Sequence, residues 1–261
     1  MTTPSFETVL LSIDGPIARL TLNRPDRMNG MTNRMVRETA DALELVAAEP
    51  AVRVLVLTGA GRSFCPGADL QAVASGSVAD ERLGPAQFRA PVLLHEMPAV
   101  SVAVINGACA GAGLGWAAAC DLRVATRRAK FNTAFLDVAV AGDMGLPWSL
   151  PRLLGAGKAR ELCMLPDKFD ADEAHRIGFL ARVFDDEHFA DEAEAIVQRL
   201  ASAAPAALRT MKANFLVAER TELGPFIEVE SERHMGLFAL DDTREAFAAK
   251  VEGRAPHYTG H

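Results

Sequence analysis

The sequence lacks the features that mark several protein classes. Its four cysteines show neither metal-ligand spacing nor a paired pattern, so we expect reduced thiols, no metal site and a cytoplasmic location. The net charge of −7 argues against nucleic acid as the main partner. The N-terminal segment has no basic stretch followed by an apolar core, so we expect no secretory signal.

Long uninterrupted apolar runs are also missing. The longest runs lie near 99–105 and 108–120, and they are broken by one asparagine and four glycines: Asn106, Gly107, Gly111, Gly113 and Gly115. A membrane-spanning helix needs about 20 consecutive apolar residues, so we expect no membrane partner. Hydrophobic residues still make up 49% of the 261 residues, which is enough for one large core or a core with an appendage.

The first half of the sequence alternates between strand and helix patterns. The strands are expected at 9–12, 17–22, 53–58, 100–105, 121–125 and 129–132, and the helices at 32–48, 87–97 and 112–120. Thr32 is the expected N-cap of the first helix, and residues 72–86 are expected to form a mobile loop.

The second half is mainly helical. Helices are predicted near 148–154, 158–165, 170–177, 188–202, 205–218, 223–240 and 242–250. Asp242 and Glu245 match a capping-box variant for the last of them. Alternating strands and helices followed by a run of helices predict an α/β core with a helical C-terminal part.

The stretch 105–115 combines a strand end, a glycine-rich turn and a helix start. A helix N-terminus presents free backbone N–H groups and the positive end of the helix dipole, which suit a negatively charged oxygen. Gly111, Ala112 and Gly113 would let that oxygen approach the backbone. Close packing of a helix on a sheet also needs small residues, so this stretch alone leaves both interpretations open.

A second junction of this kind lies at 63–70, with Pro66 and Gly67 in the turn. Taken with it, several motifs resemble the crotonase superfamily, also called the enoyl-CoA hydratase/isomerase family. The motifs are Leu22-Asn23-Arg24-Pro25 with Asn29, Phe64 to Leu70, Ile105 to Gly113, Cys120-Asp121, Leu150-Pro151-Arg152, and Ala246-Phe247 with Lys250. Their order and spacing cover nearly the whole chain.

This resemblance implies an α/β fold of ββα units wound into a spiral. It places the spiral core and the acyl-CoA site in residues 1–200, and a helical region for oligomerisation and pocket closure in 201–261. It implies a coenzyme A thioester as the substrate and a homotrimer or a dimer of trimers as the assembly. No separate cofactor is expected, because coenzyme A is part of the substrate.

The resemblance also implies an oxyanion hole made by the backbone N–H groups of Ala68 and Ala112. When a thioester loses a proton from its α-carbon, negative charge moves onto the thioester oxygen. Preorganised donors stabilise such an oxygen by about 2.7–4 kcal/mol each. Since the donors are main-chain groups, an alanine at 112 can serve where relatives often have glycine.

Two positions depart from the pattern of the family's hydratases. Those enzymes carry one glutamate at the position of Gly115 and another at that of Phe135. Adding water across a double bond needs groups that position the water and transfer protons. Neither glycine nor phenylalanine can do so, which lowers the expectation of simple hydratase activity.

Asp143 is the acid nearest the expected site, and its segment is similar to aspartate-dependent members of the family. In enoyl-CoA isomerases a single carboxylate moves a proton between two carbons. An apolar setting that includes Phe135, Val140, Met144 and Trp148 would raise the pKa of the carboxyl and strengthen the base. Asp143 could instead be an ordinary turn residue beside a glycine.

Other functions stay open at this point. A chlorobenzoyl-CoA dehalogenase would also use the aspartate, but it needs a second base. His95 is the only histidine before the glycine-rich stretch, and we interpret it as a helix-surface residue. A non-catalytic acyl-CoA binder would explain the absence of both glutamates. The sequence argues against a protease on this architecture, because it shows no convincing Ser-His-Asp set.

The remaining candidate residues concern substrate binding. Asn23, Arg24 and Pro25 resemble the family segment near the nucleotide part of coenzyme A, where Arg24 could pair with a phosphate, and Lys250 resembles a base that reaches a phosphate in a neighbouring subunit. For both Arg24 and Lys250, an ordinary surface charge is the alternative. Phe135 and Trp148 could line an acyl pocket or pack in the core. The other candidates flank the two turns: Asp69, Leu70 and Gly111, with Asp69 and Asp121 expected mainly to cap helices or brace turns.

Overall fold

A six-stranded sheet forms the centre of the computed structural model, which describes residues 5–75 and 83–260. Its strands are β1 (Val9–Asp14), β2 (Ile17–Leu22), β3 (Val54–Gly59), β4 (Val100–Ile105), β6 (Leu122–Thr126) and β9 (Arg182–Phe184), in the order β1-β2-β3-β4-β6-β9. The β1–β2 pair is antiparallel and the others are parallel. A second sheet of three short strands contains β5 (Cys109–Ala110), β7 (Lys130–Asn132) and β8 (Phe169–Asp170).

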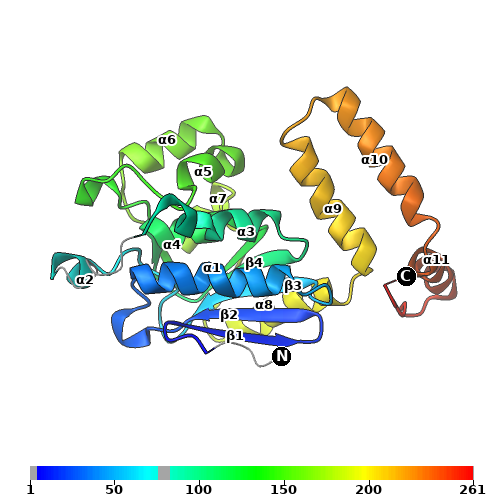
Figure 1. Ribbon diagram of the computed structural model, residues 1–261, viewed down its shortest axis with the longest axis horizontal. Helices are drawn as coiled ribbons and strands as arrows, with labels where there is room; N and C mark the ends of the chain where they lie inside the picture. The colour runs from blue at the N-terminus through cyan, green and yellow to red at the C-terminus, as the bar shows by residue number, and fades with distance from the viewer. Residues whose placement is uncertain (1–4, 76–82, 261) are drawn as a thin grey trace.

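Both faces of the central sheet are covered, as the continuous apolar runs of β3 and β4 predict. Side chains alternate between the faces of a strand. Leu55 and Leu57 therefore pack in the main core with α1 (Asn33–Ala47) and α4 (Gly111–Ala119). Val54 and Val56 pack on the other face against α8 (Phe189–Ala201). Figure 1 shows α1 lying along one side of the strands.

The first long helix follows the sequence prediction closely. The Thr32 hydroxyl caps α1 by accepting a hydrogen bond of 3.2 Å from the backbone N–H of Met35. The predicted inner face is buried: Met35, Thr39, Ala42, Leu43 and Val46. The 3.6-residue period of apolar positions was therefore sufficient to locate this helix and its orientation.

The remaining elements are helices and 3-10 turns outside the two sheets. They are α2 (Leu70–Ala74), α3 (Ala90–Glu96), α5 (Leu146–Leu154), α6 (Ala156–Met164), α7 (Ala171–Arg176), α9 (Pro205–Ala218), α10 (Leu223–Leu237) and α11 (Asp241–Glu252), with 3-10 turns at Pro25–Arg27, Pro85–Arg89 and Leu136–Val138. The helices α9 to α11 form an arm that leads away from the sheet (Figure 1). In the described part of the chain, no helix is long and apolar enough to cross a membrane.

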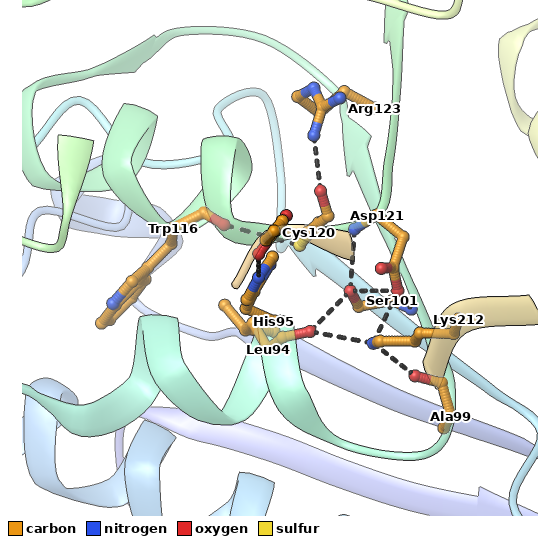
Figure 2. A network of polar contacts seen from close by, with 10 residues as sticks. Leu94, His95, Ala99, Ser101, Trp116, Cys120, Asp121, Arg123 and Lys212 are labelled. Carbon is orange, nitrogen blue, oxygen red and sulfur yellow. Dashed lines mark hydrogen bonds and ion pairs between the residues drawn. The ribbon is translucent and has the colours of Figure 1, made fainter. Parts of the chain in front are cut away.

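Lys212 ties this arm to the body of the molecule. Its side chain is only 4% exposed, and its ammonium group donates to the Asp121 carboxylate at 2.7 Å and to the carbonyl of Ala99 at 2.9 Å. The same Asp121 oxygen accepts the backbone N–H of Ser101 at 2.7 Å. Figure 2 shows these groups converging where α4 ends and β4 begins. The expectation that Asp121 braces a turn is confirmed.

Several predicted boundaries were wrong. The expected loop at 72–86 begins later, because residues 70–74 form α2; residues 76–82 of that loop lie outside the described residues. The strands β5, β8 and β9 were missed, because two or three residues are too few for a period to show.

The capping box at Asp242 was also wrong. The N-cap of α11 is Leu240, and Asp242 is buried inside the first turn. Its carboxylate accepts the backbone N–H groups of Thr259 at 2.7 Å and Gly260 at 3.0 Å, which fixes the C-terminal segment on α11. Glu245 pairs with Arg254 instead of reaching back to the start of the helix.

We predict that Lys212→Met lowers the free energy of unfolding by about 3–5 kcal/mol, because it leaves the Asp121 carboxylate partly buried without its cation. Urea denaturation followed by circular dichroism measures the change. The matched control is Lys158→Met, which removes only a surface pair with Glu161 and should leave the midpoint nearly unchanged. Equal midpoints for the two variants would contradict the prediction.

Candidate active site

The two turns singled out in the sequence lie side by side. The backbone N–H of Cys65 donates to Ala108 O, and the N–H of Ala110 donates to Cys65 O, both at 3.0 Å. A Cβ at Gly113 would lie 2.3 Å from Cys65 O, so only glycine permits this approach. The strand-like contact therefore brings the start of α4 against the turn that precedes α2.

Ala68 lies in the first of these turns. Gly67 before it has a left-handed φ of +102°, which glycine adopts without strain. Its carbonyl accepts the N–H of Met31 at 2.8 Å, and the N–H of Asp69 donates to Met31 O at 2.9 Å. Within the described residues, the N–H of Ala68 itself donates to no protein acceptor.

Ala112 is the second residue of α4, where helix N–H groups have no partner inside the helix. Gly111 before it has a φ of +50°, and no side chain caps the helix. A Cβ built on Gly67 would lie 3.6 Å from the Cα of Gly111, so the two turns are in contact. Together with the helix dipole, this arrangement suits a negatively charged oxygen.

Asp143 lies in a strained turn just before α5. Met144 has a left-handed φ of +49°, which a non-glycine residue adopts only when its surroundings enforce it. Met144 is buried against α4, and the Asp143 carbonyl accepts the N–H of Leu146 at 3.1 Å. These contacts fix the backbone, and among the described residues the Asp143 side chain has no hydrogen-bond partner.

The surroundings of the Asp143 carboxyl shift its pKa upward, which is the direction expected of a catalytic base. Its Oδ1 atom is buried and has no hydrogen-bond partner in the part of the chain that the structure describes, and burial raises the pKa of the carboxyl. Its charge also acts on the Cys65 thiol. The pKa of that thiol is raised to about 12, mainly by burial and to a smaller extent by the Asp143 charge. Asp143 and the Ala68 turn therefore share one electrostatic environment.

The two positions that lack glutamates also lie at this place. A Cβ at Gly115 would be 2.6 Å from the Cβ of Met144 and 3.0 Å from its carbonyl oxygen, so no side chain fits there. The ring of Phe135 lies within about 4 Å of the Cβ positions of both Gly111 and Gly142. It thus contacts both the Ala112 turn and the Asp143 turn.

Trp148 does not pack in the core, so that alternative was wrong. The side chain is 44% exposed because it lies on the outer face of α5, edge-on to His95 with 5.1 Å between the ring centroids. Both line a cavity of about 380 Å³ between α3 and α5, which reaches Gly145 beside Asp143. The Nε2 atom of His95 donates to the carboxylate of Glu219, the residue that follows α9, at 2.9 Å, so it joins the arm to the body.

The other predicted residues are placed at two ends of the molecule. Arg24 contacts Asp69, and Asp69 caps α2 by accepting the N–H of Ala72 at 3.1 Å, as expected. Asn23 and Pro25 flank Arg24, and Leu70 begins α2 with an exposed side chain. Lys250 is exposed on α11, at the opposite end of the molecule from α2 (Figure 1).

Comparison with known proteins agrees with this arrangement. The model of the enoyl-CoA hydratase/isomerase family matches residues 12–261. The chain belongs to this family. The chain is 33% identical over 260 residues to 1,2-epoxyphenylacetyl-CoA isomerase of Escherichia coli K12, covering 98% of this chain and 99% of that protein. It is 32% identical over 259 residues to crotonyl-CoA hydratase of Syntrophomonas wolfei, with 97% and 98% covered.

Solved structures of the family confirm the fold class. The chain superposes on the crystal structure of enoyl-CoA hydratase from Bacillus anthracis with a TM-score of 0.89 and 27% identity, covering 98% of this chain and 100% of that one. The predicted crotonase-like α/β architecture is therefore correct. Since the relatives include both isomerases and hydratases, membership identifies an enzyme family and leaves the reaction to the site.

Sequence reasoning missed two residues that build the site. The backbone of Met31 forms hydrogen bonds with Gly67 and Asp69, the residues on either side of Ala68. Any residue type can make these bonds, so the sequence carries no signal for them. Asn29, which appeared only as part of a motif, is buried and donates to Ala60 O at 2.9 Å and to Ser63 O at 2.7 Å. It anchors the turn that leads to Cys65.

We expect Gly113→Ala to lower kcat by at least about 10-fold, because the new methyl group must push the Cys65 turn away from α4 and misplace the donors. Steady-state turnover of an enoyl-CoA measures this. The control Gly157→Ala adds a methyl group to a helix with nothing within 4 Å, so activity should persist. Full activity of the Gly113 variant would refute the assignment of this contact to the site.

Proposed function

We propose that this enzyme shifts a carbon–carbon double bond in an enoyl-CoA. The N–H groups of Ala68 and Ala112 hold the thioester oxygen, and the Asp143 carboxylate carries the proton. The observation that carries the proposal is the buried, unpartnered Oδ1 of Asp143, the one carboxylate oxygen of this kind in the described part of the chain.

The reaction balances with these groups alone. Asp143 removes a proton from one carbon, and the electron pair of that C–H bond moves into the conjugated system, so that charge collects on the thioester oxygen. The two N–H donors stabilise this dienolate. Asp143 then returns the proton to a different carbon, and the double bond has moved with no gain or loss of atoms. No metal and no cofactor is needed, because coenzyme A belongs to the substrate.

Two observations favour isomerisation over hydration. First, the contact of Gly115 with Met144 leaves no space for a second acid on α4. Second, Phe135 places an aromatic ring at the other family position. Water addition needs groups that hold and deprotonate the water, whereas moving a proton within one substrate needs a single carboxylate.

The substrate and assembly follow from the same family pattern. We place the nucleotide part of coenzyme A near Asn23 and Pro25, and the acyl group beside Phe135, Gly111 and Asp143. The arm exposes large apolar side chains, among them Phe238, Phe247 and Val251. Such surfaces fit a homotrimer or dimer of trimers, in which Lys250 of one subunit reaches the phosphates bound by another.

Asp143→Asn is expected to lower kcat at least about 100-fold, because the amide cannot accept the proton. The assay incubates trans-2- and trans-3-enoyl-CoA in D₂O and follows deuterium uptake and double-bond migration by mass spectrometry and ultraviolet absorbance. The control Asp137→Asn changes an exposed carboxylate in the same segment and should keep activity. Gain of one water would indicate a hydratase, and binding without any change a non-catalytic protein.

The raised pKa of Asp143 also predicts a pH dependence. Because burial favours the protonated form in the folded state, stability is lost as the pH rises from the ordinary value of 3.8 through the raised pKa. Asp143→Asn should therefore be more stable than the wild type at about pH 7, and this advantage should shrink toward about pH 4. Urea midpoints across that range measure it. A constant or reversed difference would contradict the burial of a charged Asp143.

A further inference from the structure

Arg24 and Asp69 form an ion pair directly behind the Ala68 turn. Arg24 Nη2 lies 2.9 Å from Asp69 Oδ2, and the two side chains are 20% and 9% exposed. The other terminal nitrogen of Arg24, Nη1, donates to the carbonyl of Gly30. The guanidinium therefore bridges two chain segments, one before α1 and one before α2.

These two segments are the ones whose contact fixes the Ala68 donor. The carbonyl of Gly67 and the N–H of Ala68 belong to the same rigid peptide plane. That carbonyl accepts the N–H of Met31, and Met31 O accepts the N–H of Asp69. Arg24 contacts Gly30, which precedes Met31, and Asp69, which follows Ala68. It therefore holds a neighbour of each residue in the Met31–Ala68 bridge.

Arg24 is itself held from behind. Its backbone N–H donates to Asn29 Oδ1 at 2.9 Å, and the Asn29 amide donates to Ala60 O and Ser63 O. The chain from Ala60 to Ala68 is thus fixed at both ends by one connected set of hydrogen bonds. A planar guanidinium with two parallel donors suits this clamp in a way that a lysine ammonium does not.

Asp69 stays ionised in this setting. Burial alone would raise the pKa of its carboxyl, but the N–H of Ala72 and the Arg24 guanidinium together hold the pKa below its ordinary value. The carboxylate also occupies the Nη2 side of the guanidinium, so it would repel a phosphate that approached Arg24 there.

We propose that Arg24 is a positioning residue for the oxyanion hole: through Asp69 and Gly30 it fixes the direction of the Ala68 N–H, and it does not serve as a ligand of the coenzyme A phosphates. This rests on the proposed oxyanion hole. It replaces the role in nucleotide binding that the sequence pattern implied for Arg24. Asp69 thereby gains a function in turnover besides capping α2.

The test compares wild type, Arg24→Gln, Asp69→Asn and the double variant, with kcat and KM measured for an enoyl-CoA and for its 3′-dephospho analogue. Asparagine also caps helices well, so Asp69→Asn removes the ion pair and keeps the cap. We expect each single variant to lower kcat about 10-fold with little change in KM. The kcat of the double variant should be about the same as that of either single variant.

A phosphate ligand would behave differently. Arg24→Gln would then raise KM for the full thioester, and KM for the dephospho analogue would stay unchanged if Arg24 binds the 3′-phosphate or rise as well if it binds the diphosphate. Asp69→Asn would leave kcat unchanged. Either result overturns the proposal. If Arg24→Gln fails to fold, the kcat of Asp69→Asn is sufficient to decide the question. Arg24→Lys should retain only part of the wild-type turnover. Asp170→Asn, an N-cap of α7 on a different surface, is the matched control and should keep full activity.

This test is separable from that of the proposed function. The clamp acts on the thioester oxyanion, which forms in hydration as well as in isomerisation, so it is measured on whichever turnover the wild type shows. Activity retained in the Asp143 variant would overturn the choice of base and leave the clamp intact. An unchanged kcat in the Asp69 variant would overturn the clamp and leave Asp143 as the base.

Discussion

The close approach of two backbone segments is the constraint on which the site depends. The segment from Ser63 to Ala68 and the segment from Gly107 to Gly113 are hydrogen-bonded through Cys65, with no room for a side chain at Gly113. The donors of the proposed oxyanion hole are main-chain groups on these two segments, so their separation is set by glycine positions and by sheet geometry. The proposal therefore requires no particular side chain at 68 or 112.

The helix α4 carries this geometry into the rest of the molecule. Its first turn contains Ala112, whose N–H has no acceptor within the helix, and all residues of the helix are buried. Its C-terminal end is held by Arg123, which donates to Cys120 O at 2.5 Å, and by the Asp121–Lys212 pair (Figure 2). The cation of that pair comes from α9, so the arm that leads away from the sheet also fixes the helix that forms the site.

The Asp143 carboxyl differs in its surroundings from the other titratable groups near the two turns and on α4. Burial raises the pKa of the Cys65 and Cys120 thiols to about 12, so both are neutral and unreactive at physiological pH. The Asp69 carboxylate is held by Arg24 and by the start of α2. Asp143 differs from these groups because its strained turn is fixed by backbone contacts alone, which leaves its carboxylate free to accept a proton.

The sequence by itself determined the family, the α/β class, the capped helix α1 and the two turns with their glycines, because these depend on local periodicity and on short motifs. Only the tertiary structure decided that Gly115 has no space for an acid, that Trp148 faces a cavity, and that Arg24 is occupied by Asp69. Each of these facts depends on contacts between residues distant in the chain. Packing between separate elements leaves no periodic pattern in the sequence of either element, so the sequence of one segment cannot reveal these contacts.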